Sequence, residues 1–283
     1  MSPQSYNPYH GHFPEFNIDR VEQALKPEIP KIGLIWLDET GSTNEEARRL
    51  AKWGALEWTV VVAGVQTGGR GRYKRTWASP PGGLYQSLLL RLPQSDSPVT
   101  LIPLLVGLAL KQGIEDELSR LGGGDFHGWL KWPNDLVTER GKLAGILCEA
   151  SVEKDRWEII AGAGVNLEPV KLQDHSDQHL QPASSLLEEF PDLEWTREEV
   201  LTAYLHRLKQ GLDLWARDPE QVRKDWLEAS GMEGREVEAT SSGEKIRGIA
   251  QGIGEGGELQ IETEAGLRKL NAAEALIVRD HWL

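Results

Sequence analysis

Apolar side chains recur at helical spacing in two long segments of the chain. Residues 100–121 place apolar side chains every three or four positions and are followed by three glycines, which predicts a long helix with a glycine stop. Residues 197–218 show the same period and predict a second long helix. Shorter helices are predicted over residues 17–26, 43–53 and 219–230.

Runs of β-branched and apolar residues indicate the strands. Residues 59–66 and 83–92 each have the length of a buried strand, so the segment between them is predicted to be a strand-to-strand loop. Residues 168–195, rich in Pro, Asp, His and Ser, are predicted to form a second loop. Further strand-like segments are residues 31–40, 128–137, 141–151 and 156–167.

The pattern changes after Gly231. Short alternating strands, separated by glycine-rich turns, follow at near-regular spacing and predict a small closed β-barrel of about fifty residues. We therefore expect an N-terminal arm with a short helix (residues 1–30), an α/β domain (residues 31–230) and a barrel domain (residues 231–283).

Charge and composition exclude several classes of function. The net charge is −13, from 31 basic and 44 acidic residues, so a general polyanion binder would be repelled by its own field and nucleic acid is disfavoured as the main partner. No apolar run approaches the roughly 18 residues that span a bilayer, and no signal-peptide pattern opens the chain. The single cysteine, Cys148, fits a reducing cytoplasm.

The stretch GGRGRYKRTW, residues 68–77, concentrates glycine and positive charge in one loop. Its glycines permit positive φ and close approach of backbone N–H groups to an anion, and its arginines supply forked donors for phosphate or carboxylate. A solvated turn and a nucleic-acid patch are the alternatives. The residues concerned are Gly68, Gly69, Gly71, Arg70, Arg72, Arg75 and Trp77.

Two later motifs add polar groups at strand ends. In KWPND, Pro133 forces an extended residue before it and leaves Asn134 and Asp135 at the end of a strand, with Lys131 as a further cation; an ordinary Asn-Asp turn is the alternative. In GKLAGIL, Lys142 begins a strand that is too apolar to be exposed, which indicates either an anionic partner or a side chain that extends to solvent.

Gly145 interrupts that strand, where a ligand or another backbone can approach. Residues 162–166, GAGVN, end another apolar strand with small residues and the amide of Asn166; a tight turn is the alternative. Ser42 precedes a helix and is predicted to cap it, unless the hydroxyl and amide groups of residues 42–44 line a pocket.

Three features are given structural interpretations. GIGEGG, residues 252–257, matches a dinucleotide-binding pattern but precedes a strand-like segment, so we expect a hairpin turn. Cys148 lies inside an apolar strand and is expected to be a buried structural thiol. His10 and His12 are expected to belong to an unstructured tail rather than to a metal site. With no nucleophile or metal cage, these groups indicate phosphoryl or nucleotidyl chemistry in which the protein positions its substrates and neutralises charge.

Five motifs and the predicted barrel together resemble the biotin–protein ligases, over about residues 35–280. The resemblance implies an α+β fold: a mixed β-sheet flanked by helices, of the class II synthetase-like kind, with an SH3-like C-terminal barrel. The motifs, in order, are STN, GGRGRYKRTW, KWPND, GKLAGIL and GAGVN.

The resemblance implies a two-step, cytoplasmic reaction. The carboxylate of biotin attacks the α-phosphorus of Mg·ATP to give biotinyl-adenylate, and a lysine of a biotin carboxyl carrier protein then takes the biotinyl group. Only about 35 residues precede the first predicted strand, too few for a helix-turn-helix domain, so we expect no operator binding. A lipoate– or octanoate–protein ligase is the nearest alternative, and a biotin-responsive transcriptional regulator is a weaker one. A homodimer is left open.

The resemblance also implies site residues. Lys142 would stabilise charge on the carboxylate and α-phosphate, Arg72 would close over the adenylate, and Asp135 would orient the nucleotide and the incoming lysine. Gln66 would bind the ureido group of biotin, and no protein ligand to Mg²⁺ is identified. The remaining biotin and adenylate contacts would come from Ser42, Thr43, Asn44, Gly69, Arg70, Gly71, Arg75, Trp77, Lys131, Asn134, Gly145, Ile146 and Asn166.

Overall fold

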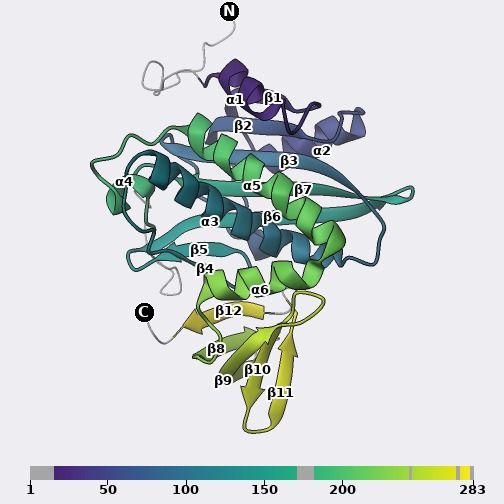
Figure 1. Ribbon diagram of the computed structural model, residues 1–283, viewed down its shortest axis with the longest axis vertical. Helices are drawn as coiled ribbons and strands as arrows, with labels where there is room; N and C mark the ends of the chain where they lie inside the picture. Colours follow the sequence, from purple (N-terminus) through teal and green to yellow (C-terminus); the bar gives the residue numbers. More distant parts are fainter. Residues whose placement is uncertain (1–15, 171–181, 242–243, 272–274, 281–283) are drawn as a thin grey trace, which may run out of the picture.

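A seven-stranded mixed sheet forms the centre of the larger domain (Figure 1). The computed structural model describes residues 16–170, 182–241, 244–271 and 275–280. In the sheet, β1 pairs with β2 in parallel and the other pairs are antiparallel, in the order β1-β2-β3-β7-β6-β5-β4. The strands are β1 (Gly33–Thr40), β2 (Thr59–Gln66), β3 (Gly83–Pro93), β4 (Trp129–Lys131), β5 (Asp135–Thr138), β6 (Gly141–Glu153) and β7 (Arg156–Asn166).

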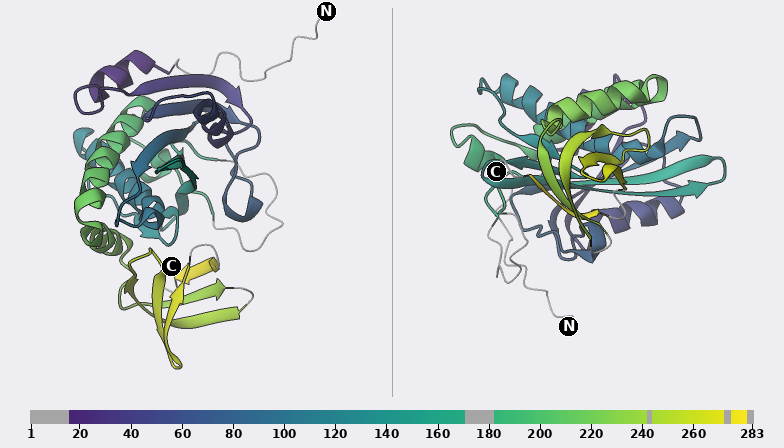
Figure 2. Two further views of the ribbon diagram at one scale, coloured as in Figure 1. Left: turned by 90° about the vertical axis from the view of Figure 1, so that its right-hand side faces the viewer. Right: turned by 90° about the horizontal axis from the view of Figure 1, so that it is seen from below.

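Helices cover the two faces of this sheet unequally. The long helices α3 (Ile102–Arg120) and α5 (Arg197–Arg217) pack together on one face, and α2 (Thr43–Lys52) packs on the other, as Figure 2 shows. Most buried apolar side chains lie between the sheet and the α3–α5 layer. The α2 face has a small core of its own, so part of that face is free for polar and glycine positions.

Shorter helices complete the larger domain. Helix α1 (Ile18–Leu25) packs on α5 and β1, and α6 (Pro219–Ser230) leads to the small domain and ends at Gly231, which has a φ of 60°. A left-handed C-cap of this kind is a common helix stop. The remaining helical turns are η1 (Arg72–Lys74), η2 (Val99–Leu101) and α4 (Leu186–Glu189).

The small domain is a five-stranded antiparallel sheet in the order β11-β10-β9-β8-β12. Its β9–β10 turn packs on the larger domain, where the indole N–H of Trp132 donates to the carbonyl of Gly257 at 3.0 Å. Arg223 donates to the carbonyl of Ile253 at 3.0 Å. The strands are β8 (Glu236–Ser241), β9 (Glu244–Ile253), β10 (Leu259–Thr263), β11 (Gly266–Leu270) and β12 (Ala275–Asp280).

Most predicted elements are confirmed, and two differ. Residues 128–137 form two paired strands, β4 and β5, with a turn at residues 132–134 between them, so the strand end predicted at Pro133 and the alternative of a turn in KWPND are both confirmed. The predicted loop 168–195 contains the short helix α4, capped by Ser185. The predicted barrel is, among its described residues, a sheet with β11 and β12 at its ends. The GIGEGG turn is confirmed; His10 and His12 lie outside the described residues.

Candidate active site

Paired glycines on β6 and β7 make a flat floor on the α2 face of the sheet. Gly145 pairs with Gly164 across the two strands, and Gly162 pairs with Leu147. A Cβ atom at Gly164 would collide with the indole nitrogen of Trp77, and one at Gly145 would lie 3.1 Å from the Trp77 ring. Only glycine therefore lets this indole lie flat against the strands. The group that approaches Gly145 in the structure is the Trp77 side chain rather than another backbone, and the predicted approach of a ligand stays a prediction.

The loop that carries Trp77 is held by its own backbone. Trp77 N–H donates to the carbonyl of Gly69 at 2.9 Å, and Gly71 N–H donates to the carbonyl of Arg75 at 2.8 Å. A Cβ atom at Gly69 would collide with the Trp77 carbonyl, so this glycine lets the two arms of the loop come together; the approach of its N–H groups to an anion stays a prediction.

The predicted positive φ of the loop glycines is wrong. Gly71 has a φ of −109°, and the positive values fall instead on Tyr73, at 55°, and Lys74, at 60°. Both lie in the short turn η1 at the tip of the loop. Gly69 is required for space between the two arms of the loop rather than for a left-handed conformation, whereas a Cβ atom at Gly71 would make only ordinary contact.

The loop arginines point to different partners. Arg72 donates to the side-chain oxygen of Asn134 at 3.3 Å and lies over the Tyr73 ring, so it connects the loop to the KWPND turn. Arg70 pairs with Glu45 at the start of α2, and Arg75 is exposed. Of the three, Arg72 alone has a side-chain contact to another of the predicted motifs.

Lys142 and Asp135 form the charged centre of the site. The ammonium nitrogen of Lys142 lies 2.6 Å from Asp135 Oδ1 and 5.1 Å from the centre of the Trp77 ring. A register shift between β5 and β6 pairs Lys142 with Val137, while Asp135 pairs with Gly145. Of the two interpretations of Lys142, the structure supports the one with an anionic partner.

The turn between β4 and β5 is fixed against β6 by an amide. Asn134 donates its side-chain N–H to the carbonyl of Ile146 at 2.7 Å, and Ile146 N–H donates to the carbonyl of Asn134 at 2.9 Å. The Ile146 side chain is buried in the core on the other face, so only its backbone faces the turn. Lys131 is buried and pairs with Asp135 in the ladder of β4 and β5.

Asn166 lies at the end of β7 and is buried. Its side-chain N–H groups donate to the carbonyl of Ser184 at 2.9 Å and to the carbonyl of Lys142 at 3.3 Å. Asn166 thus ties the segment at residues 182–184 to the beginning of β6, where Lys142 stands. Its predicted contact with substrate is untested.

The start of α2 carries a cluster of buried polar side chains. Ser42 stands at the N-cap position, but its side chain makes no capping hydrogen bond, so the predicted side-chain cap is wrong. Thr43 N–H donates to Gln66 Oε1 at 2.8 Å, and Gln66 Nε2 donates to Ser79 Oγ at 2.8 Å. Ser42, Thr43 and Asn44 are all buried.

Ser87 belongs to the same cluster of buried polar side chains and was not predicted from the sequence. Ser87 on β3 is fully buried, and its hydroxyl oxygen lies 2.7 Å from Thr43 Oγ1 and 2.6 Å from Asn44 Oδ1. A serine directly before the mainly apolar run LLLRL, residues 88–92 of a predicted buried strand, was the available signal, because a buried hydroxyl requires a partner.

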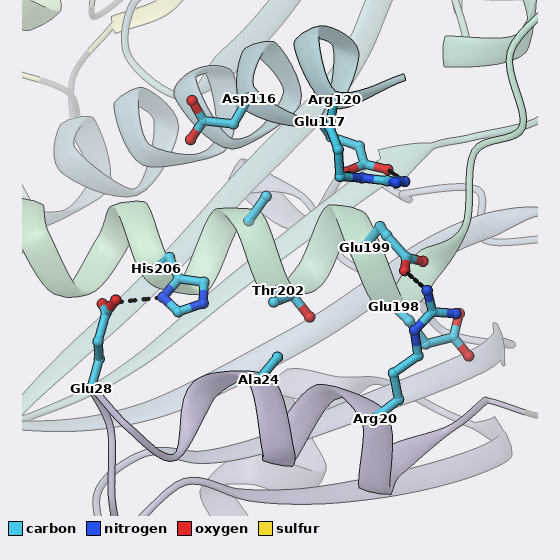
Figure 3. A pocket seen from close by; sticks show the side chains of 11 residues that line it. Arg20, Ala24, Glu28, Asp116, Glu117, Arg120, Glu198, Glu199, Thr202 and His206 are labelled. Carbon is cyan, nitrogen blue, oxygen red and sulfur yellow. Dashed lines mark hydrogen bonds and ion pairs between the residues drawn. The ribbon is translucent and has the colours of Figure 1, made fainter. Parts of the chain in front are cut away.

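A second hollow lies among α1, α3 and α5, on the other side of the sheet (Figure 3). Its charged groups pair with one another: Arg20 with Glu199, Arg120 with Glu117, and His206 with Glu28 at 3.1 Å. None of the residues predicted for the site lines it. We therefore place the candidate site on the α2 face.

Two further features concern metal ions and membranes. Within the described part of the chain, no group of three or more His, Cys, Asp or Glu side chains could hold a metal ion. Among the described helices, none is long and apolar enough to cross a membrane.

Comparison with known proteins identifies the family. Residues 36–166 match the biotin/lipoate A/B protein ligase family, and residues 234–278 match the biotin protein ligase C-terminal domain. The bifunctional ligase/repressor BirA of Bacillus subtilis is 32% identical over 261 residues, covering 90% of this chain and 77% of BirA. The biotin–[acetyl-CoA-carboxylase] ligase of Paracoccus denitrificans is 31% identical over 253 residues, covering 84% and 98%.

Solved structures agree with this assignment. The biotin protein ligase of Aquifex aeolicus, in complex with biotin and ATP, superposes with a TM-score of 0.72 at 31% identity, covering 88% of this chain and 99% of that one. The predicted fold class, a mixed sheet flanked by helices with a small C-terminal β-domain, is confirmed. The chain belongs to the biotin/lipoate A/B protein ligase family.

Proposed function

We propose that this protein is an ATP-dependent biotin–protein ligase. It activates biotin as biotinyl-5′-AMP and transfers the biotinyl group to a lysine of a biotin carboxyl carrier protein. The observation that supports this best is the cluster of Lys142, Asp135 and Trp77 on the glycine floor of β6 and β7. Named relatives support the choice of biotin, since the Aquifex aeolicus structure contains biotin and ATP.

The first step joins a carboxylate to the α-phosphorus of ATP and releases pyrophosphate. As the carboxylate attacks and the bond to pyrophosphate breaks, negative charge builds up on the α-phosphate oxygens and the departing pyrophosphate; the Lys142 ammonium would stabilise it, with Arg72 as a second cation. Asp135 holds Lys142 in place before substrate arrives, at 2.6 Å. The remaining predicted contacts surround these groups.

The second step transfers the acyl group to the acceptor lysine and releases AMP. That lysine attacks as the neutral amine, and Asp135 would accept the proton that the amine loses as the amide forms. Mg²⁺ would be held chiefly by ATP phosphates and water, as is usual for this ion.

We further propose that the chain divides at residues 1–30, 31–230 and 231–283. The proposed location is the cytoplasm, and no nucleic-acid partner is proposed.

Biotin-dependent exchange of labelled pyrophosphate into ATP tests the first step without any acceptor. The purified protein should catalyse this exchange with Mg²⁺ and biotin, and not when lipoate or octanoate replaces biotin. Exchange that depends on lipoate instead of biotin would reject the proposal in favour of a lipoate ligase.

A further inference from the structure

A continuous chain of polar side chains runs from the surface of α2 to the loop of Trp77. Arg48 pairs with Glu149 at 2.5 Å, and Glu149 accepts from Asn44 Nδ2 at 2.9 Å. Asn44 then contacts Ser87, Ser87 contacts Thr43, and Thr43 contacts Gln66. A Cβ atom at Gly162 would collide with Asn44 Oδ1, so this glycine leaves the space that the chain needs.

The orientation of the Asn44 amide is determined by its outer partners. Its nitrogen lies 3.2 Å from the carbonyl oxygen of Leu147 and 2.9 Å from the carboxylate of Glu149, which are both acceptors. The amide must therefore present N–H groups outward and its oxygen inward, toward Ser87. Because Asn44 Oδ1 can only accept, the hydroxyl hydrogen of Ser87 points to it across 2.6 Å.

Three contacts between oxygen atoms, from Ser87 to Asn44, from Ser87 to Thr43 and from Thr43 to Gln66, then share only two hydroxyl hydrogens. Ser87 and Thr43 have one hydroxyl hydrogen each. Ser87 uses its hydrogen on Asn44, which leaves the single hydroxyl hydrogen of Thr43 to serve either Ser87 at 2.7 Å or Gln66 Oε1 at 3.1 Å. We assign it to the shorter contact, because two oxygens 2.7 Å apart repel more strongly without a hydrogen between them than two at 3.1 Å. No hydrogen then remains for the 3.1 Å approach of Thr43 Oγ1 to Gln66 Oε1.

Gln66 cannot resolve this by turning over. Its oxygen accepts from Thr43 N–H at 2.8 Å, and that backbone group can only donate. Thr43 Oγ1 and Gln66 Oε1 therefore face each other as two acceptors, on the α2 side of the sheet. Two acceptor oxygens at this distance are stabilised when a donor from a ligand lies between them or beside them.

We propose that Ser87 is a specificity-determining positioning residue, which fixes Thr43 Oγ1 and Gln66 Oε1 as acceptors for N–H donors of the substrate ring. The inference rests on the proposed function and deepens it. The cyclic urea of biotin carries two N–H groups, whereas the dithiolane ring of lipoate carries none. Thr43 Oγ1 and Gln66 Oε1 would favour the cyclic urea, because only that ring supplies N–H groups that these two acceptors can bind.

Ser87→Ala removes the group that orients Thr43 and adds no bulk. With intact protein we expect the KM for biotin to rise roughly 10- to 100-fold, the KM for ATP to stay within about twofold, and kcat to be retained, as for loss of uniform binding. We also expect the variant to discriminate less than the wild type between biotin and a biotin methylated on a ureido nitrogen. Ser230→Ala is the matched control, because Ser230 is equally buried and bonds to the carbonyl of Leu227 at 2.7 Å, far from the site.

Glu149 provides a second test at a partly exposed position. Glu149→Gln still offers an acceptor to Asn44 and should leave the KM for biotin near the wild-type value. Glu149→Lys offers only donors, favours the reversed amide of Asn44 and should raise that KM. This pair remains informative if Ser87→Ala fails to fold.

Three outcomes would overturn the inference while leaving the proposed function intact. They are a folded Ser87→Ala variant with an unchanged KM for biotin, an equal rise in the KM for ATP, and identical behaviour of the two Glu149 variants. A wild-type protein without biotin-dependent pyrophosphate exchange would instead reject the proposed function itself.

Discussion

Lys142 and Asp135 stand on neighbouring strands with their charged atoms 2.6 Å apart. Both side chains are about a quarter exposed, at 25% and 22%, so solvent screens the pair and its net contribution to stability is small. The position of the pair, beside Trp77 and above paired glycines, is therefore explained better by chemistry than by folding.

Replacing Lys142 tests that interpretation. Lys142→Ala should lower the rate of biotin-dependent pyrophosphate release by about 10²–10³, the scale for removing one preorganised charge-stabilising group. Lys111→Ala is the matched control, because Lys111 also pairs with a carboxylate, Glu115, and lies 5.7 Å from the centre of an aromatic ring, that of Phe126. Similar losses in the two variants would assign the Lys142 effect to folding.

The glycine floor can be tested by adding one methyl group. Gly164→Ala would collide with the Trp77 indole and displace it, so we expect weaker biotin binding and a change in tryptophan fluorescence. Gly33→Ala is the control. Gly33 lies on β1 of the same sheet, and a Cβ atom there has no other group within 4 Å. Unchanged biotin affinity in Gly164→Ala would show that Trp77 does not need this position.

The loop arginine is expected to retain the intermediate. Arg72→Gly should release biotinyl-adenylate into solution faster than the wild type, because its guanidinium, which contacts Asn134, is lost. Lys74→Gly serves as the control for flexibility, since it adds a glycine to the same loop, at a residue with a φ of 60°, and keeps Arg72. Equal release from Arg72→Gly and the wild type, measured by trapping free adenylate, would reject the role in retention.

The contact of Trp132 with the small domain is expected to affect both stability and activity, whereas a similar contact of Trp215 within the larger domain should affect stability alone. Trp132→Phe removes the indole donor to the carbonyl of Gly257, and Trp215→Phe removes the donor to the carbonyl of Pro98, both at 3.0 Å. Each should lower the free energy of unfolding by about 1 kcal/mol. Only Trp132→Phe should also slow adenylate formation, because Trp132 precedes Asn134 and Asp135. Full activity of Trp132→Phe would mean that the small domain does not position that turn.

The single cysteine should be unreactive in the folded protein. Burial, with a smaller effect from the charge of Glu149, raises the pKa of the Cys148 thiol to about 12. The folded state thus keeps this proton to higher pH than the unfolded chain, so the associated stability is present below the unfolded pKa of about 8.5 and is lost as the pH rises toward the folded value. At pH 8.5, alkylation should be at least about 100-fold slower than in denaturant. Cys148 is partly buried rather than fully buried as the sequence suggested, and equal rates would contradict the raised pKa of its thiol.

The sequence predicted those features that depend on local pattern. Helical period located α3 and α5, and the order of the glycine- and lysine-containing motifs indicated the family. Pro133 signalled the end of β4, but the pairing of the next residues with β4 as the separate strand β5 has no distinct local signal.

The parts of the site that depend on strand register could not be predicted. Asp135 was placed near a strand end, but its ion pair with Lys142 arises from the register shift between β5 and β6. Ser87 was overlooked because its partners, Thr43 and Asn44, come from a helix far away in the chain. Arg70 and Arg75 were grouped with Arg72, but Arg70 is directed to Glu45 by contacts that only the folded loop reveals.

The most direct test is to weigh the acceptor after the complete reaction. The purified protein is incubated with ATP, Mg²⁺, a biotin carboxyl carrier domain and an equal mixture of biotin and lipoate. We predict that the acceptor gains the mass of one biotinyl group, and that an acceptor lacking its target lysine gains none. An acceptor that gains a lipoyl group, or no mass at all, would contradict the assignment of this protein as a biotin–protein ligase.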